Sequence, residues 1–372
     1  MIKFLKMAAA ALLLMPVFTA CDDDDSPVTP PDPVVKNTVL STMYVTIQGN
    51  QYGGVPGSID FIEGGVTDMT TVISDLFTQT NRQSLGDSPQ HAVRYGSKIY
   101  VPMNGSNILW VLDAQTLRII KKVQNENTVG AWAVCGSGDY VYLLNYAHDG
   151  YVTRIDTVDY AVQGTVHVGS YPYDITPANG KLYVAMSGDY MQDYADGCKV
   201  AVVDEASFSH NGEYAVGLNP TQIFANRLGE LFVMCQGNYG TATPKVWKID
   251  KAGNAAEWCD GGLCAMSGND LYVLGFTSDY QNNVATIDSF KKYNTATNIA
   301  SQAAADITLD ATVSHCLPIA LNIHPANGHI VICADKNPMG YAETGWVTEY
   351  EADGTLIGRK NVGIHPFGVI FK

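Results

Sequence analysis

Basic side chains are scarce in this sequence. Its 372 residues include 22 Lys and Arg against 37 Asp and Glu, which gives a formal net charge of −15. A surface that carries so many more carboxylates than cations repels phosphate backbones. We therefore do not expect nucleic acid as a partner.

The common catalytic motifs are absent as well. The sequence has no Gly-x-Ser-x-Gly, His-Glu-x-x-His or Cys-x-x-Cys pattern and no phosphate-binding loop. We predict that the protein is not an enzyme and that it holds no catalytic residue, no metal and no cofactor. An alternative stays open, in which His91, His315 and His365 converge as ligands of a metal or as axial ligands of a cofactor.

A long apolar run occurs at the N-terminus, where residues 8–17 follow Lys3 and Lys6. This pattern predicts a secretion signal over residues 1–20, because the run is too short to span a bilayer as a permanent helix. The sequence Phe18-Thr19-Ala20-Cys21 resembles the lipobox of bacterial lipoproteins, with Phe18 where Leu is more usual. The resemblance implies that Cys21 is lipidated; a plain signal with a chance cysteine is the alternative.

The segment after the lipobox is acidic and rich in proline. Residues 21–37 contain Asp22 to Asp25 and four prolines by Pro33, and such a composition predicts an extended tether. The acidic stretch resembles the one that follows the lipid-bearing cysteine in surface-exported lipoproteins of the Bacteroidota. That resemblance implies a lipid-anchored protein in the outer membrane, facing the cell exterior, with the anchor as its only membrane contact.

Cysteine usage gives little evidence for disulfides. Of the eight cysteines, Cys21 is assigned to the lipid, and an odd number cannot all pair. Cys235 and Cys333 lie inside predicted strands and are expected to be buried. Cys259 and Cys264 are close enough in sequence for a local disulfide, which the sequence leaves open.

The remaining chain, residues 38–372, repeats one short phrase whose clearest copy is Lys181 to Met186. The copies are centred, 40 to 59 residues apart, on Tyr44, Tyr100, Tyr142, Tyr183, Phe232, Tyr272 and Val331. Phrases rich in aromatic and β-branched residues are typical of strands that are buried on both faces. A small sheet with two apolar faces is stabilised by stacking against its neighbours, so the period predicts an all-β, seven-bladed β-propeller. A two-sheet sandwich is the alternative, but it does not account for seven copies.

The repeat also predicts how the ring closes. Six blades are expected at residues 88–126, 127–168, 169–217, 218–259, 260–311 and 312–362. His365 to Phe371 is a first strand with no phrase after it, whereas residues 38–80 have the phrase without a first strand. The two ends of the chain should therefore share the seventh blade, which removes an exposed sheet edge.

One face of this propeller has the composition of a binding surface. The loops after the repeated phrases are rich in Tyr, Asn and Gly, and the segments that lead into the first strands, such as Tyr173, should lie on the same face. Tyr offers a large contact area at low entropic cost. We predict a ligand-binding funnel formed by Tyr52, His91, Trp132, Tyr146, Tyr171, Tyr190, Tyr194, Tyr239, Tyr280, His315, Tyr341 and His365.

The leading proline, the Gly-Lys-Leu-Tyr-Val phrase, the Val-x-Ile-Asp strand and the closing Val-Gly of the repeats resemble YncE-like β-propellers. With the lipobox and the acidic tether, the chain is similar to surface propeller lipoproteins of the BtuG type. This resemblance implies capture of cobalamin (vitamin B12), as a bound ligand and not a cofactor, and its transfer to a TonB-dependent outer-membrane transporter. Two alternatives remain: the same architecture with a glycan, haem or protein ligand, and a propeller enzyme such as a lactonase or a quinone-dependent dehydrogenase.

Overall fold

The structure is a computed structural model that describes residues 41–297, 305–310 and 315–372. The predicted secretion signal at residues 1–20, the lipidation site at Cys21 and the tether at residues 21–37 lie outside the described residues.

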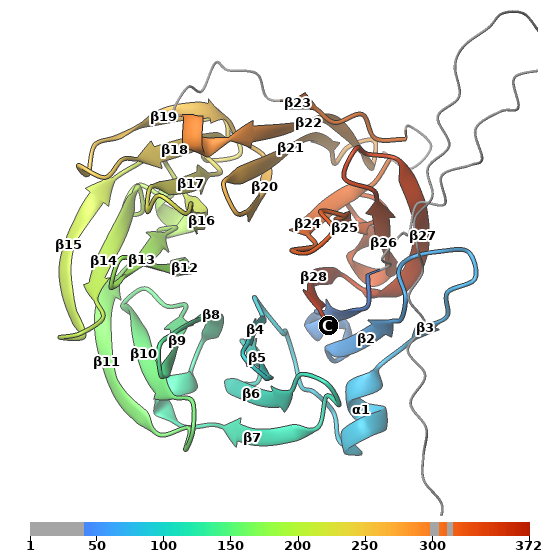
Figure 1. The fold of residues 1–372 in the computed structure, drawn as a ribbon, viewed down its shortest axis with the longest axis horizontal. Coiled ribbons are helices and arrows are strands. Elements are labelled where there is room, and N and C mark those ends of the chain that lie inside the picture. Colours follow the sequence, from blue (N-terminus) through green and yellow to red (C-terminus); the bar gives the residue numbers. More distant parts are fainter. Residues whose placement is uncertain (1–40, 298–304, 311–314) are drawn as a thin grey trace, which may run out of the picture. The chain divides into compact units, whose positions relative to one another are not determined.

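Seven four-stranded antiparallel sheets are arranged in a ring around a central channel (Figure 1). In each sheet the strands are given from the channel outwards. The sheet that joins the two ends of the chain contains β28 (Pro366–Phe371), β1 (Met43–Ile47), β2 (Ser58–Ile62) and β3 (Val72–Ile73). The next contains β4 (Val93–Tyr95), β5 (Lys98–Met103), β6 (Ile108–Asp113) and β7 (Ile119–Val123). The third contains β8 (Ala131–Ser137), β9 (Tyr140–Asn145), β10 (Gly150–Asp156) and β11 (Val162–Gly169).

The other four sheets repeat this order. They are β12 (Pro172–Ala178), β13 (Lys181–Met186), β14 (Lys199–Asp204) and β15 (Ser209–Ala215), followed by β16 (Pro220–Ala225), β17 (Leu231–Cys235), β18 (Lys245–Ile249) and β19 (Ala255–Asp260). The last two are β20 (Leu263–Ser267), β21 (Asp270–Asp279), β22 (Val284–Asn294) and β23 (Ala305–Asp306), then β24 (Leu317–Ile323), β25 (Ile330–Asp335), β26 (Thr344–Tyr350) and β27 (Leu356–Ile364). Helical turns are short: α1 (Leu76–Asn81), η1 (Gln51–Gly53), η2 (Glu126–Thr128), η3 (Tyr190–Gln192), η4 (Thr295–Thr297) and η6 (Gly340–Ala342).

The repeated phrase forms the second strand of each sheet, as the period predicts. In β13 every residue from Leu182 to Met186 is buried, and the five residues of β17 are all buried. Their side chains alternate between two faces, and a separate apolar cluster fills each of the seven gaps between neighbouring sheets. Each large buried side chain contributes about 1.5–3 kcal/mol by leaving water, so the ring is held by these interfaces.

The predicted closure of the ring is confirmed. The innermost strand β28 pairs with β1 in the register Tyr44 with Ile370 and Val45 with Val369. Two segments at opposite ends of the sequence thus complete one blade, and the strands of the six remaining blades lie within two residues of the predicted ranges.

The disulfide that the sequence left open is not formed. All seven cysteines of the described residues are free thiols. Cys259 lies in β19 at the outer edge of its sheet, whereas Cys264 lies in β20, next to the channel in the following sheet. The few residues between them therefore cross from the rim to the centre of the ring.

Candidate functional site at the channel mouth

The loops that follow β1, β5, β9, β13, β17, β21 and β25 open at one end of the channel, which we call the loop face. Hydrogen bonds join neighbouring loops on this face, including Asn238 Nδ2 to Asp193 Oδ2 at 3.1 Å and Met339 N to Asn283 Oδ1 at 3.0 Å. The four exposed aromatic side chains of the described residues all lie in these loops: Tyr52, Tyr190, Tyr239 and Tyr280. These exposed tyrosines therefore lie on the face whose loops have the composition of a binding surface.

Four of the seven blades begin their innermost segment with a similar backbone conformation. A residue with a positive φ precedes the proline of this segment, at Ser88, Tyr171, Asn219 and His365. An extra residue then interrupts the register of several first strands, for example between Pro172 and Asp174. Such a bulge bends the strand and redirects a side chain, which places a residue like Tyr173 at the mouth of the channel.

Aromatic rings from several blades meet at this mouth. The Trp132 ring stacks on Tyr146 with centroids 4.4 Å apart and planes at 24°, and its edge contacts Tyr173 at 5.0 Å. Tyr146 also contacts Tyr171 at 5.0 Å. We call His91, Trp132, Tyr146, Tyr171, Tyr173 and Phe367 the aromatic cluster. Packed pairs of this kind add about 0.5–1.5 kcal/mol each beyond their buried area, so the cluster is a rigid platform.

His91 links the cluster to the closing blade. Its ring contacts Phe367 at 5.1 Å, Tyr173 at 6.0 Å and Trp132 at 6.5 Å. Burial lowers the pKa of His91 to about 4, so the imidazole is neutral at physiological pH.

A second tyrosine pair borders the aromatic cluster. Tyr194 and Tyr239 contact each other edge to face at 6.1 Å. Burial is the main cause that raises the pKa of Tyr146 to about 12, and the proximity of Tyr171 and Tyr194 adds to this shift. Tyr239 is 75% exposed, so it forms the solvent-facing edge of the same surface.

Other predicted residues lie apart from the cluster. Tyr52, Tyr190 and Tyr280 are exposed on the loop rim, with 103%, 68% and 62% of their surface accessible. The backbone of Tyr341 lies in η6, and its side chain is outside the described part of the chain. No ring contact joins Tyr52, Tyr190 or Tyr280 to the cluster within the described residues.

The histidines that we considered as metal or cofactor ligands have different surroundings. His315 is exposed and faces Thr286, with 3.4 Å between Nδ1 and Oγ1. His365 pairs through Nδ1 with Oδ2 of the buried Asp335 at 2.7 Å and packs near Phe367. In the described ranges, no group of three or more His, Cys, Asp and Glu side chains is arranged to hold a metal ion.

Phe367 and Gln90 were not among the predicted site residues. Both follow a proline at the start of an inner segment, Pro366 and Pro89, just as Tyr173 follows Pro172. The position after the proline was a usable signal, because a bulge there, as at Tyr173 and Phe367, determines which side chain faces the channel.

A cavity of about 150 Å³ lies in the channel under the aromatic cluster. His91 and Phe367 belong to both, and the polar lining residues include Thr46, Gln90, Gln222 and Asn322. The innermost strands around the cavity are latched to each other, since Gln222 exchanges two hydrogen bonds with the backbone of Cys264 at 3.0 and 2.9 Å.

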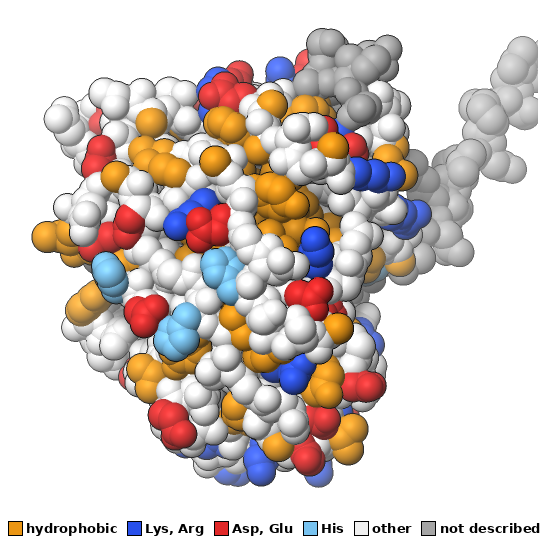
Figure 2. All heavy atoms as spheres, turned by 90° about the vertical axis from the view of Figure 1, so that its left-hand side faces the viewer, with side chains coloured by type: hydrophobic (Ala, Val, Ile, Leu, Met, Phe, Trp, Pro, Cys, Tyr) orange, Lys and Arg blue, Asp and Glu red, His pale blue; other side chains and the backbone are white. Residues whose placement is uncertain are grey.

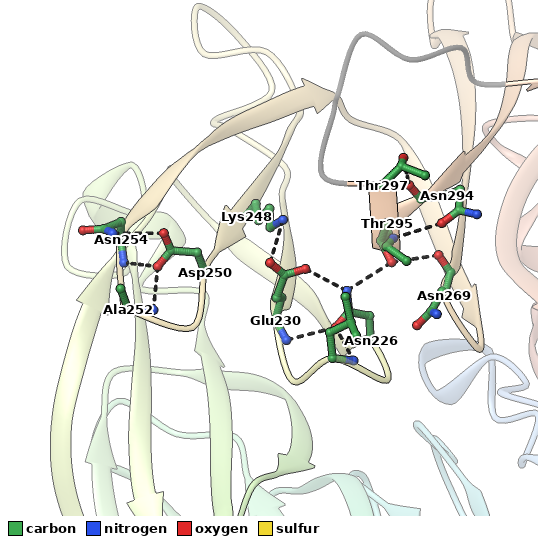
Figure 3. A network of polar contacts seen from close by, with 12 residues as sticks. Asn226, Glu230, Lys248, Asp250, Ala252, Asn254, Asn269, Asn294, Thr295 and Thr297 are labelled. Atoms are coloured by element: carbon green, nitrogen blue, oxygen red, sulfur yellow. Dashed lines mark hydrogen bonds and ion pairs between the residues drawn. The ribbon is translucent and has the colours of Figure 1, made fainter.

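The opposite end of the ring carries a structural polar network (Figure 3). Lys248 Nζ lies 2.9 Å from Glu230 Oε1, and Asn226 Nδ2 donates to Glu230 Oε2 at 3.0 Å. Asn226 Nδ2 also donates to Thr295 Oγ1 at 3.2 Å, which joins this sheet to the following one. Lys248 and Glu230 are each only 10% exposed, so the network fixes the contact between two blades.

The flank of the ring that includes β11 and β15 shows acidic and basic side chains interspersed, with exposed histidines among them (Figure 2). His167, for example, lies 3.2 Å from Asp149. This flank is a mixed, solvated surface. None of the helices described is long and apolar enough to cross a membrane.

Comparison with one solved structure supports the fold, and the comparisons assign no ligand. No curated protein matches this chain significantly. Among solved structures, the chain is similar to a Kuenenia stuttgartiensis hydrazine synthase, with 18% identity and a TM-score of 0.58 over 71% of this chain and 77% of that one. It is also similar, at 12% identity and a TM-score of 0.48, to the computationally designed Ika8 protein, over 75% of this chain and 88% of that one. A family model matches residues 44–372, which is nearly the whole propeller, and the chain accordingly belongs to the DUF5074 family, described as a domain of unknown function.

Proposed function

We propose that this propeller is a non-enzymatic binding protein that captures cobalamin at the channel mouth and passes it to a TonB-dependent outer-membrane transporter. The protein is anchored through lipidated Cys21 in the outer membrane and faces the cell exterior. The observation that carries the proposal is the aromatic cluster, a set of packed rings at the centre of the loop face.

The chemistry of the surface suits a large, flat ligand. A corrin presents an extended apolar ring, which rings such as Trp132 and Tyr146 can cover at low entropic cost. Its peripheral amides need hydrogen-bond partners, and the Asn, Asp and Tyr side chains of the surrounding loops are of that kind. Tight capture at a nanomolar Kd corresponds to about 12 kcal/mol, which requires several aromatic contacts at once.

Isothermal titration of the chain that starts after Pro33 with cyanocobalamin tests the proposal. We expect stoichiometric binding that weakens when Trp132 is replaced by Ala. Absence of heat, together with no shift of Tm at high micromolar cyanocobalamin, would contradict the cobalamin assignment. Haem and oligosaccharides titrated under the same conditions then identify which other ligand the cluster takes.

Transfer needs a separate experiment. Membranes that contain the candidate transporter should take up cobalamin faster when the lipidated protein is present. Replacing Cys21 with Ser removes the predicted acylation site, so we expect the protein to be lost from the outer membrane while the released protein still binds cobalamin.

A further inference from the structure

The cavity under the aromatic cluster has polar groups whose bonding is incomplete. Gln90 is only 3% exposed, yet its Oε1 is buried without a hydrogen-bond partner among the described residues. The Nε2 atom of His91 is buried and unpartnered in the same way. Buried acceptors and donors are normally satisfied, because an unmade bond costs about 1–3 kcal/mol.

The other amide side chains that line the cavity do have hydrogen-bond partners. Gln222 uses both ends of its amide on Cys264, and Asn322 Oδ1 accepts from Val369 N at 3.3 Å. These two side chains join adjacent innermost strands, whereas the Gln90 amide makes a long hydrogen bond within its own segment, from Nε2 to Ser88 O at 3.5 Å. Gln90 and His91 therefore offer unused polar atoms to whatever enters the cavity.

The cavity is also free of formal charge. The residues that line it include no Asp, Glu, Lys or Arg, and the other polar groups are amides and the Thr46 hydroxyl, which donates to Gly368 O at 3.1 Å. A charged ligand group would lose its hydration there without a countercharge, which is costly. The lining favours an uncharged group that both donates and accepts hydrogen bonds.

We propose that the channel cavity binds a primary carboxamide arm of the ligand, held by Gln90 Oε1 and His91 Nε2, while the flat part of the ligand covers the aromatic cluster above. This inference rests on the proposed function and adds to it which part of the ligand the cavity recognises. The amide N–H donates to Gln90 Oε1, and the amide offers both a donor and an acceptor, so it matches either tautomer of His91. A volume of about 150 Å³ accommodates such a short arm.

The ligand side of the test uses the unaltered protein. Cyanocobalamin is compared with its monocarboxylate isomers, in each of which one peripheral carboxamide is hydrolysed to a carboxylate. We expect one isomer to bind at least tenfold more weakly than the others, because its carboxylate would be buried in the uncharged cavity. Equal affinity of all isomers and the parent compound would overturn the inference.

The protein side uses Gln90→Leu, with Gln115→Leu on an exposed turn at the other end of the ring as the matched control. Gln90→Leu should raise the Kd for cyanocobalamin about five- to tenfold and keep or raise Tm, because it removes a buried unpaired acceptor. The selectivity against the discriminated isomer should shrink in the same variant. A loss of affinity and Tm together, with selectivity retained, would show a merely structural role and overturn the inference.

The two proposals fail in different ways. If cyanocobalamin does not bind the unaltered protein, the proposed function is wrong, and this inference with it. If it binds and Gln90→Leu leaves both affinity and isomer selectivity unchanged, the cavity holds only water and the inference alone is wrong.

Discussion

Trp132 and Tyr146 stack nearly parallel at the channel mouth, with ring centroids 4.4 Å apart. The two residues come from the first strand of one blade and from the loop that follows its second strand. Ring pairs at the centre of a desolvated surface are typical of residues that dominate binding energy. We predict that Trp132→Ala weakens cyanocobalamin binding by about 2 kcal/mol, or roughly 30-fold in Kd, as measured by titration calorimetry.

The matched control for this prediction is Tyr52→Ala. Tyr52 is fully exposed on the loop rim and makes no ring contact with the cluster, so its removal should change Kd less than twofold. Equal losses in both variants would place the ligand on the rim and contradict a central site.

A second prediction concerns Asp174, which lies beside the channel in β12. Its Oδ2 accepts from Ile223 N in the next blade at 2.9 Å, and its Oδ1 accepts from Ile175 N. Burial raises the pKa of Asp174 to about 7, against the lowering effect of these two bonds. Between the ordinary pKa near 3.8 and about 7, the folded protein holds a proton that the unfolded chain has lost, so stability decreases as pH rises.

Between pH 5 and 8, we expect the free energy of unfolding of the unaltered protein to fall by roughly 2–3 kcal/mol relative to that of Asp174→Asn. The comparison of the two proteins cancels the opposite contribution of His91, whose lowered pKa makes stability rise with pH. Urea denaturation at several pH values measures the difference. A difference in free energy of unfolding that stays constant with pH would contradict the prediction and show that Asp174 does not change its protonation in this range.

The fold was predictable from the sequence because the same strand phrase repeats once in each blade. Each repeated phrase is buried on both faces, so Tyr183, Phe232 and their equivalents mark one strand per blade without knowledge of distant contacts. The closure of the ring followed from the same repeat. The first strand at Pro366–Phe371 has no repeated phrase after it, and the repeated phrase around Tyr44 has no first strand before it, so the two pair.

The candidate site was predictable only in part. Position along the repeat identified Tyr146 and Tyr171, which flank a second and a first strand directly, and Trp132, which lies at the start of a first strand. It could not separate them from Tyr52, since both kinds of tyrosine follow the same sequence rule and differ only in how the loop folds. Phe367 was missed because its direction depends on a bulge, a register shift between two ends of the chain.

A third prediction concerns the buried pair Glu230 and Lys248 at the end of the ring opposite the loop face. Glu230→Gln should destabilise the protein by about 3–5 kcal/mol, because it removes the carboxylate that compensates a buried ammonium group. The double variant Glu230→Leu with Lys248→Met should recover most of this loss. Thermal unfolding and urea titration measure both changes.

Affinity provides the control for this variant. The network lies far from the aromatic cluster along the channel axis, so Glu230→Gln should leave the Kd for cyanocobalamin unchanged at a temperature where the protein is folded. A parallel loss of affinity would mean that the two ends of the ring are coupled.

The last prediction concerns the closing strand β28. Ending the chain at His365 removes the partner of β1 and the contribution of Ile370 to the cluster between the first and second sheets. The truncated chain exposes a long unpaired edge, and we expect it to lose cooperative unfolding and to aggregate. Circular dichroism melts and size-exclusion chromatography measure both effects.

The matched control is a chain that lacks only Lys372. This deletion removes one backbone hydrogen bond, to Thr42 O at 2.9 Å, and one cation–π contact, with Tyr44, but leaves β28 intact. This control should melt as a single transition close to that of the full chain. If the longer truncation also does so, the ring does not depend on the shared blade. Otherwise, a synthetic peptide of residues 366–372 should restore the transition by adding the missing strand.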